Sequence, residues 1–170
     1  TGLTEKRDYD VWLVAEDASE NLQSSAFKID FTTIDDISPE FASGFPGIKA
    51  VDETNVEIEV KINEGGTIYA VAQLEGQSAP SFAQIKAGTN STETTALSSN
   101  SVSLTSNEVG TLDMTGLEIE VGYDFYVIAE DLFENASGTP VKLSATTVDL
   151  KAPTITPTFL TEVSVTQDEV

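Results

Sequence analysis

Apolar and polar residues alternate with a period of two in several segments of this chain. The alternation is clearest in residues 9–15, 56–62, 101–105 and 123–129, where one set of positions is mostly valine, isoleucine, leucine or aromatic. This pattern predicts half-buried β-strands. Clusters of glycine, serine and asparagine separate the strands at spacings of about ten residues, which is typical of an antiparallel β-sandwich. Residues 81–87 are expected to form a single helical turn, so the predicted fold is all-β.

The pattern also repeats on a much longer scale. The segment YDVWLVAEDASEN that begins at Tyr9 recurs as YDFYVIAEDLFEN at Tyr123, and TGL at Thr1 recurs at Thr115. Other identical pairs at the same offset are Lys28 with Lys142, Thr33 with Thr147, Asp35 with Asp149 and Pro39 with Pro153. The offset is 114 residues throughout, without a gap, which predicts a tandem repeat of β-sandwich domains.

This offset predicts where the domains begin and end. Residues 36–150 are expected to form one complete sandwich. Residues 1–35 then correspond to the last strands of a preceding repeat, and residues 151–170 to the first strand or strands of a following one. Because an incomplete sandwich exposes its core face and its strand edges, we expect these segments to be completed by adjacent repeats or by neighbouring copies.

The two tyrosine segments resemble the fibronectin type III and immunoglobulin-like superfamily. Leu3 and Leu117 each stand six residues before a tyrosine, Tyr9 or Tyr123, that opens a strand. The resemblance implies that both tyrosines form structural tyrosine corners, in which the hydroxyl bonds to the chain a few residues upstream. The endings AEDASEN and AEDLFEN resemble a hairpin that is common in the surface repeats of microbial multidomain proteins. This second resemblance implies a cell-surface setting.

Composition excludes several classes of function. With 29 acidic and 8 basic residues, the formal net charge is −21, which opposes binding to nucleic acid or to an anionic membrane surface. The chain contains neither cysteine nor histidine, so a disulfide framework, a thiolate nucleophile and a serine–histidine–aspartate triad are all excluded. No run of residues is long and apolar enough for a membrane-spanning helix. We therefore expect a protein that is not an enzyme and that needs no cofactor.

Acidic pairs raise the question of calcium, which prefers oxygen ligands. The candidate ligands are Glu16, Asp17, Asp35, Glu130, Asp131 and Asp149. No segment has the spacing of an EF-hand loop. The alternative is that these carboxylates form turns and solvated charges, because short polar side chains bond to the local backbone.

Two sequons, at Asn90 and Asn135, are candidates for N-linked glycosylation, and both fall in predicted loops. A second surface feature is the outer face of the tyrosine strands, where Trp12 and Tyr126 stand beside further apolar residues. These aromatic side chains are expected either to pack under a neighbouring strand or loop, or to contact an adjacent domain or chain.

These features predict an extracellular structural repeat of a surface stalk, filament, S-layer-like coat or adhesin. Its expected partners are neighbouring copies or adjacent repeats, and surface glycans are a further candidate. The alternative is a β-sandwich module that binds carbohydrate or protein, either on its own or as an accessory to a secreted enzyme. An aromatic platform in the loops would favour that alternative, and Phe82 and Phe133 are the candidates for it.

Overall fold

The computed structural model describes residues 2–154, and most of its regular structure is β-strand. The strands are β1 (Asp8–Leu13), β2 (Phe27–Thr32), β3 (Gly47–Val51), β4 (Asn55–Lys61), β5 (Gly66–Leu74), β6 (Ser98–Leu104), β7 (Val109–Thr115), β8 (Gly122–Asp131) and β9 (Val141–Thr146). One short helix, α1 (Phe82–Lys86), interrupts them in the described part of the chain. Each of the four segments with period-two alternation overlaps a strand, so the all-β prediction is confirmed.

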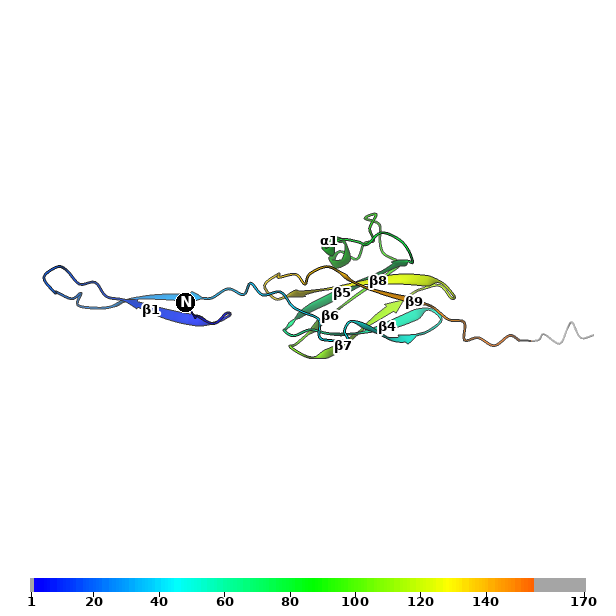
Figure 1. The fold of residues 1–170 in the computed structure, drawn as a ribbon, viewed down its shortest axis with the longest axis horizontal. Coiled ribbons are helices and arrows are strands. Elements are labelled where there is room, and N and C mark those ends of the chain that lie inside the picture. Colours follow the sequence, from blue (N-terminus) through cyan, green and yellow to red (C-terminus); the bar gives the residue numbers. More distant parts are fainter. Residues whose placement is uncertain (1, 155–170) are drawn as a thin grey trace, which may run out of the picture.

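Seven of the strands form a β-sandwich. One sheet has the order β3-β4-β7 and the other has the order β6-β5-β8-β9, and every pairing is antiparallel. The two sheets stack face to face (Figure 1). The predicted antiparallel, immunoglobulin-like β-sandwich is therefore confirmed.

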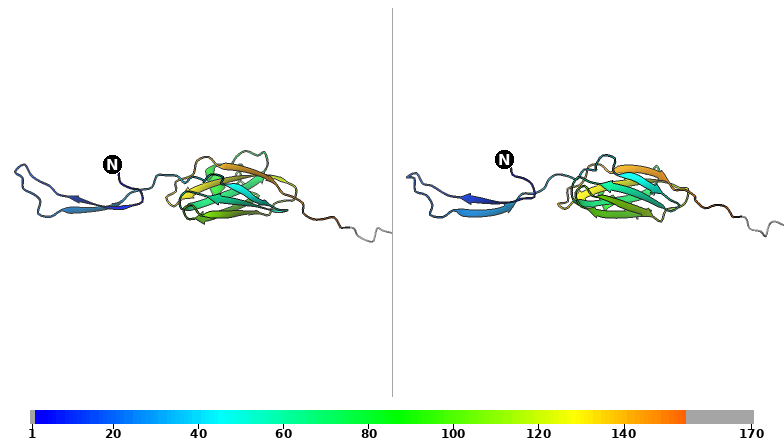
Figure 2. Two further views of the ribbon diagram at one scale, coloured as in Figure 1. Left: turned by 60° about the horizontal axis from the view of Figure 1, so that its bottom comes forward. Right: turned by 90° about the horizontal axis from the view of Figure 1, so that it is seen from below.

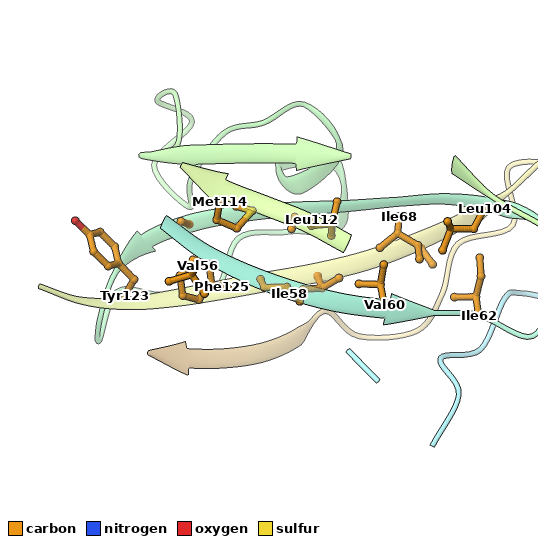
Figure 3. Close-up of a cluster of buried hydrophobic side chains, with 14 of the residues drawn as sticks. Val56, Ile58, Val60, Ile62, Ile68, Leu104, Leu112, Met114, Tyr123 and Phe125 are labelled. Carbon is orange, nitrogen blue, oxygen red and sulfur yellow. The ribbon is translucent and has the colours of Figure 1, made fainter. Parts of the chain in front are cut away.

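The core lies between the sheets and follows directly from the alternation. Every second residue of β4 is buried, and the charged residues between them face outward. The apolar side chains of β4 meet those of β5, β7 and β8 (Figure 3). Fully buried members include Val56, Ile58, Val60, Ile68, Leu112, Met114 and Phe125. At about 25 cal/mol per Å² of buried apolar surface, this cluster is the main source of stability for the sandwich.

The outer face of β5 and β8 is covered by α1 and its flanking loops. Ser81 caps the helix: its hydroxyl accepts a bond from the Gln84 N–H, and the Gln84 side chain accepts one from the Ser81 N–H. Ile85 then packs with Tyr126 in a second apolar cluster. Tyr126 therefore packs under a neighbouring segment of its own domain. No helix within residues 2–154 is long and apolar enough to cross a bilayer.

Strands β1 and β2 form a separate two-stranded hairpin with no other paired strand in the described residues. The hairpin lies beyond one end of the sandwich, and the segment that follows β9 leaves from the opposite end (Figures 1 and 2). Most of residues 151–170, the predicted start of a following repeat, lie outside the described residues.

Candidate functional site

A tyrosine hydroxyl anchors the turn that precedes β8. The Glu118 N–H donates a 2.8 Å bond to Tyr123 Oη. The Thr147 hydroxyl donates to the Glu118 carbonyl at 2.5 Å and accepts from the Val121 N–H at 3.0 Å. Tyr123 is 2% exposed, so its ring sits in the core while its hydroxyl holds the loop. This is the geometry of a tyrosine corner.

The hairpin contains the same arrangement 114 residues earlier. The Thr4 N–H donates to Tyr9 Oη at 2.7 Å. The Thr33 hydroxyl donates to the Thr4 carbonyl at 2.6 Å and accepts from the Arg7 N–H at 3.0 Å. Sequence reasoning does not single out this threonine as a site residue, although Thr33 and Thr147 form an identical pair in the repeat.

The turns at the hairpin tips are also built alike. Asp17 accepts bonds from the N–H groups of Ser19 and Asn21, both at 2.9 Å, and from the Asn21 side chain at 3.0 Å. Asp131 accepts the equivalent three bonds from the second tip, each at 2.8 Å. Bonds from Asn21 lower the pKa of Asp17. Burial raises the pKa of Asp131, but the bonds from Asn135 and Phe133 together with the other hydrogen-bond contributions outweigh it and the pKa is lowered. Both aspartates therefore serve as turn-forming carboxylates.

A lysine connects the hairpin to the sandwich. The Lys6 ammonium contacts the Asp35 carboxylate and lies 3.0 Å from Glu64 Oε2. The Asp35 side chain is 1% exposed. The bonds to Asp35 and then to Glu64 raise the pKa of Lys6. A charged lysine therefore links the last residue of the first segment to the β4–β5 turn of the sandwich.

Two further contacts complete this joint, which we define as Lys6, Asp35, Glu64, Phe133 and Asn135. The Asn135 side-chain amide donates to the Asp35 carbonyl at 3.0 Å and to the Asp131 carboxylate at 2.8 Å. The Lys6 ammonium lies 5.4 Å from the centre of the Phe133 ring, within the range of a cation–π contact. Contacts from Lys6 and from residues of the sandwich thus meet at Asp35. They hold the linker between β2 and β3 where the chain enters the sandwich.

The predicted calcium ligands fall into two groups. Among the described residues, one cluster of acids comes within ligand distance of a common point: Asp35, Glu64 and Asp131, with oxygens within 4.8 Å of one another. Its oxygen donors suit calcium, but the Lys6 ammonium already lies against two of the three carboxylates. Glu64 is not among the predicted calcium ligands. This sequence contains no counterpart 114 residues further on that would have drawn attention to it.

The other four candidates do not belong to this cluster. Glu130 forms an ion pair with Lys86 at 2.6 Å, and Asp149 accepts a 2.8 Å bond from the Lys151 N–H. Glu16 and Asp17 lie near the tip of the exposed hairpin.

The two sequons differ in how their asparagines are engaged. Asn90 uses its side-chain oxygen to accept bonds from Thr92 and Thr94 within its own loop. In contrast, the Asn135 side-chain nitrogen, the atom that would carry a glycan, donates one bond to the Asp35 carbonyl and one to the Asp131 carboxylate. A sugar on this nitrogen would leave it a single N–H, so at least one of these two bonds would be lost.

The two loop aromatics lie in different surroundings. Phe82 packs against the second apolar cluster, as Tyr69 also does. Phe133 is 52% exposed and lies beneath the ammonium of Lys6. The structure therefore does not bring them together as one aromatic platform.

Strand β8 contains a buried carboxylate, Asp124, whose counterpart in the hairpin is exposed. Asp124 is fully buried and accepts bonds from the Gly76 N–H, the Ser144 hydroxyl and the Lys142 ammonium. Burial raises the pKa of Asp124, but Lys142 and the other donors outweigh it and the pKa is lowered. The matching Asp10 of β1 pairs with Lys28 at 3.1 Å but is exposed.

Among known proteins, similarity to this chain is found at the level of three-dimensional structure. No family model and no curated protein matches the chain. Among solved structures, one from a computer-based redesign of a β-sandwich protein is similar over 71% of this chain and 98% of its own, with 16% sequence identity and a TM-score of 0.40. The β-sandwich assignment rests on the strand pairings described above.

Proposed function

We propose that this chain is part of a tandem array of β-sandwich repeats that acts as an extracellular spacer and assembly module. The array would belong to a surface stalk, filament, S-layer-like coat or adhesin. The observation that carries the proposal is that hairpin β1–β2 reproduces the tyrosine corner and the tip turn of the β8–β9 hairpin, 114 residues earlier. A segment with the corner and the tip of a closing hairpin is best explained as the end of another sandwich.

The joint supports a spacer role. Lys6, Asp35 and Asn135 hold the linker against the end of the sandwich. Pro39, which fixes its own φ, is buried just beyond it. A short linker that is bonded on both sides limits bending, so successive units would line up as a semi-rigid rod. The hairpin and the outgoing chain lie at opposite ends of the sandwich (Figure 2), as such a rod requires.

Charge and sequence resemblance support an extracellular setting. A net charge of −21 keeps neighbouring rods hydrated and apart. The resemblance to fibronectin type III-like repeats of microbial surface proteins points the same way. The partners in this account are adjacent repeats and neighbouring copies of the same protein.

Electron microscopy of the natural full-length protein, together with antibody labelling of intact cells, tests this proposal. We expect elongated particles with regularly spaced domains, and labelling without permeabilisation. Compact, dispersed particles that bind an immobilised glycan would instead support a carbohydrate-binding module and contradict the spacer role.

A further inference from the structure

The hairpin β1–β2 presents on both faces the apolar side chains that β8–β9 buries. Val11 is 38% exposed whereas its counterpart Phe125 is fully buried. Trp12 is 61% exposed and its counterpart Tyr126 only 5%. Further exposed apolar residues of the hairpin are Leu13, Val14, Phe27, Ile29 and Phe31. An exposed apolar surface on both sides of a two-stranded sheet marks an interaction surface.

The same chain shows what covers such a hairpin. In the sandwich, β8 lies between β9 and β5, its inner face packs on the core from β4 and β7, and its outer face packs beneath α1. In the hairpin, β1 has a strand neighbour on one edge, β2, within the described residues. Compared with β8, strand β1 therefore lacks three neighbours: a strand of the β5 type on its other edge, a facing sheet, and a helix of the α1 type over its outer face.

We propose that hairpin β1–β2 docks into a five-stranded acceptor of the β3–β7 type, supplied by the preceding repeat of the same polypeptide. This inference rests on the tandem organisation proposed above. It also specifies the register in which β1 pairs with the β5-type strand of the acceptor. In the β5–β8 pairing, Val71 lies opposite Tyr126 and Ala72 lies opposite Phe125. Transferred by 114 residues, Trp12 lies opposite the acceptor position of Val71, beneath an α1-type helix.

The side chains of the hairpin suit this acceptor. Val11 is smaller than its counterpart Phe125, and Phe31 is larger than its counterpart Ala145. Phe31 pairs with Tyr9, two residues from Val11 and on the same face, so the volume lost at one position is regained at a diagonal neighbour. The acceptor core thus meets a similar total volume.

The register also makes a demand on the acceptor. Gly66 lies opposite Asp131, and a Cβ atom at Gly66 would stand 2.4 Å from the Glu130 carbonyl oxygen. The corresponding hairpin residues are Glu16 and Asp17, so the acceptor needs a glycine where the hairpin tip crosses it.

The chain itself can supply the acceptor for an experiment. Residues 36–114 are placed directly before Thr1 of the whole chain, so that Met114 is followed by Thr-Gly-Leu as it is in the sandwich. Trp12 is the one tryptophan in the sequence, so its fluorescence reports on the hairpin alone. We expect a blue-shifted emission, a several-fold loss of quenching by iodide, and hydrogen-exchange protection of Asp8–Leu13 close to that of β8.

A matched variant tests the register. Gly66→Val in the added copy alone is expected to abolish the blue shift and the protection, while the original sandwich stays folded as an internal reference. If Trp12 is as accessible to iodide in the extended chain as in the parent chain, the proposal is overturned, whether or not the added strands fold. A blue shift that survives Gly66→Val would overturn the register.

Two further outcomes separate this inference from its alternatives. If Trp12 of the unextended chain becomes protected as protein concentration rises, a second copy covers the hairpin and the proposal is wrong. If docking succeeds but the natural protein is absent from the cell surface, the inference stands and the extracellular function fails.

Discussion

At the scale of single residues, buried polar groups hold the loops to the core. Tyr123, Thr147 and Asp124 each satisfy backbone or side-chain donors that would otherwise lie unpaired near the core. A buried donor without a partner costs more free energy than a made hydrogen bond contributes. These residues should therefore matter more for stability than their polar character suggests.

The corner tyrosine can be tested with a matched pair of variants. Tyr123→Phe leaves the ring in place but removes the acceptor of the Glu118 N–H, so we expect the free energy of unfolding to fall by about 1–2 kcal/mol. Tyr126→Phe on the opposite face of β8 also keeps its ring in place and should cost less, because no hydrogen bond like that of the Glu118 N–H depends on it among the described residues. Urea unfolding followed by circular dichroism measures both. Equal losses would contradict the role of the Tyr123 hydroxyl.

The buried carboxylate of Asp124 should make stability depend on pH. Because its folded pKa lies below its ordinary value of 3.8, its charge contributes stability at neutral pH, and this contribution is lost as the pH falls below about 4. Asp124→Asn should cost about 1–3 kcal/mol at neutral pH and progressively less as the medium becomes acidic. Asp113→Asn, on an exposed position of β7, is the control and should have little effect. A cost for Asp124→Asn that does not change with pH would rule out this linkage.

At the scale of elements, the strands follow the hydrophobic pattern closely. Period-two alternation identifies β4, where charged residues separate the buried ones, and β8, where the residues between the inward-facing ones are also buried, beneath α1 and its flanking loops. The pattern carries no distinct signal for β3, which is short and only partly buried. Its pairing with β4 depends on the neighbouring strand, which local alternation does not encode.

The joint is only partly predictable from sequence for a similar reason. Asp35 and Asp131 stand out as acidic candidates, but their meeting with Glu64 depends on how the linker folds back onto the sandwich. Lys6 does not stand out, because its repeat counterpart is Glu120, a residue of opposite charge. The tyrosine pair, in contrast, is visible because both copies lie within the chain.

Close approach between strands gives a second test at this scale. Gly66→Ala in the unextended chain places a Cβ against the Glu130 carbonyl, and we expect a loss of about 1–3 kcal/mol in the free energy of unfolding. Gly138→Ala is the control, because a Cβ added there would meet no atom within 4 Å apart from those of its chain neighbours. Denaturant unfolding of the two variants compares them directly, and indistinguishable midpoints would refute the steric argument.

The joint itself should respond to loss of its lysine. Lys6→Met removes the cation between Asp35 and Glu64, so the hairpin should sample a wider range of orientations. Because the chain has no cysteine, Ser25→Cys and Ser101→Cys allow two spin labels to be placed and their distance distribution measured. We expect a broader distribution in Lys6→Met and an unchanged one in Lys49→Met, which removes an ion pair on the sandwich. No broadening in Lys6→Met would show that the ion pairs do not restrain the hairpin.

At the scale of the whole molecule, the chain in this account spans parts of successive β-sandwich units joined end to end. The sandwich is complete, the hairpin carries the closing features of another, and the joint connects the two. In this account the acidic residues behind the net charge of −21 are spread over the surface of an extended, hydrated particle. They do not form a binding site for a cation-rich partner.

Electron cryomicroscopy of the natural full-length protein tests this account most directly. We predict that residues 1–35 form the last two strands of a sandwich, with Trp12 buried beneath a short helix and the next sandwich following in line. A hairpin that stands free, or that folds back onto the sandwich of residues 36–150, would contradict the account.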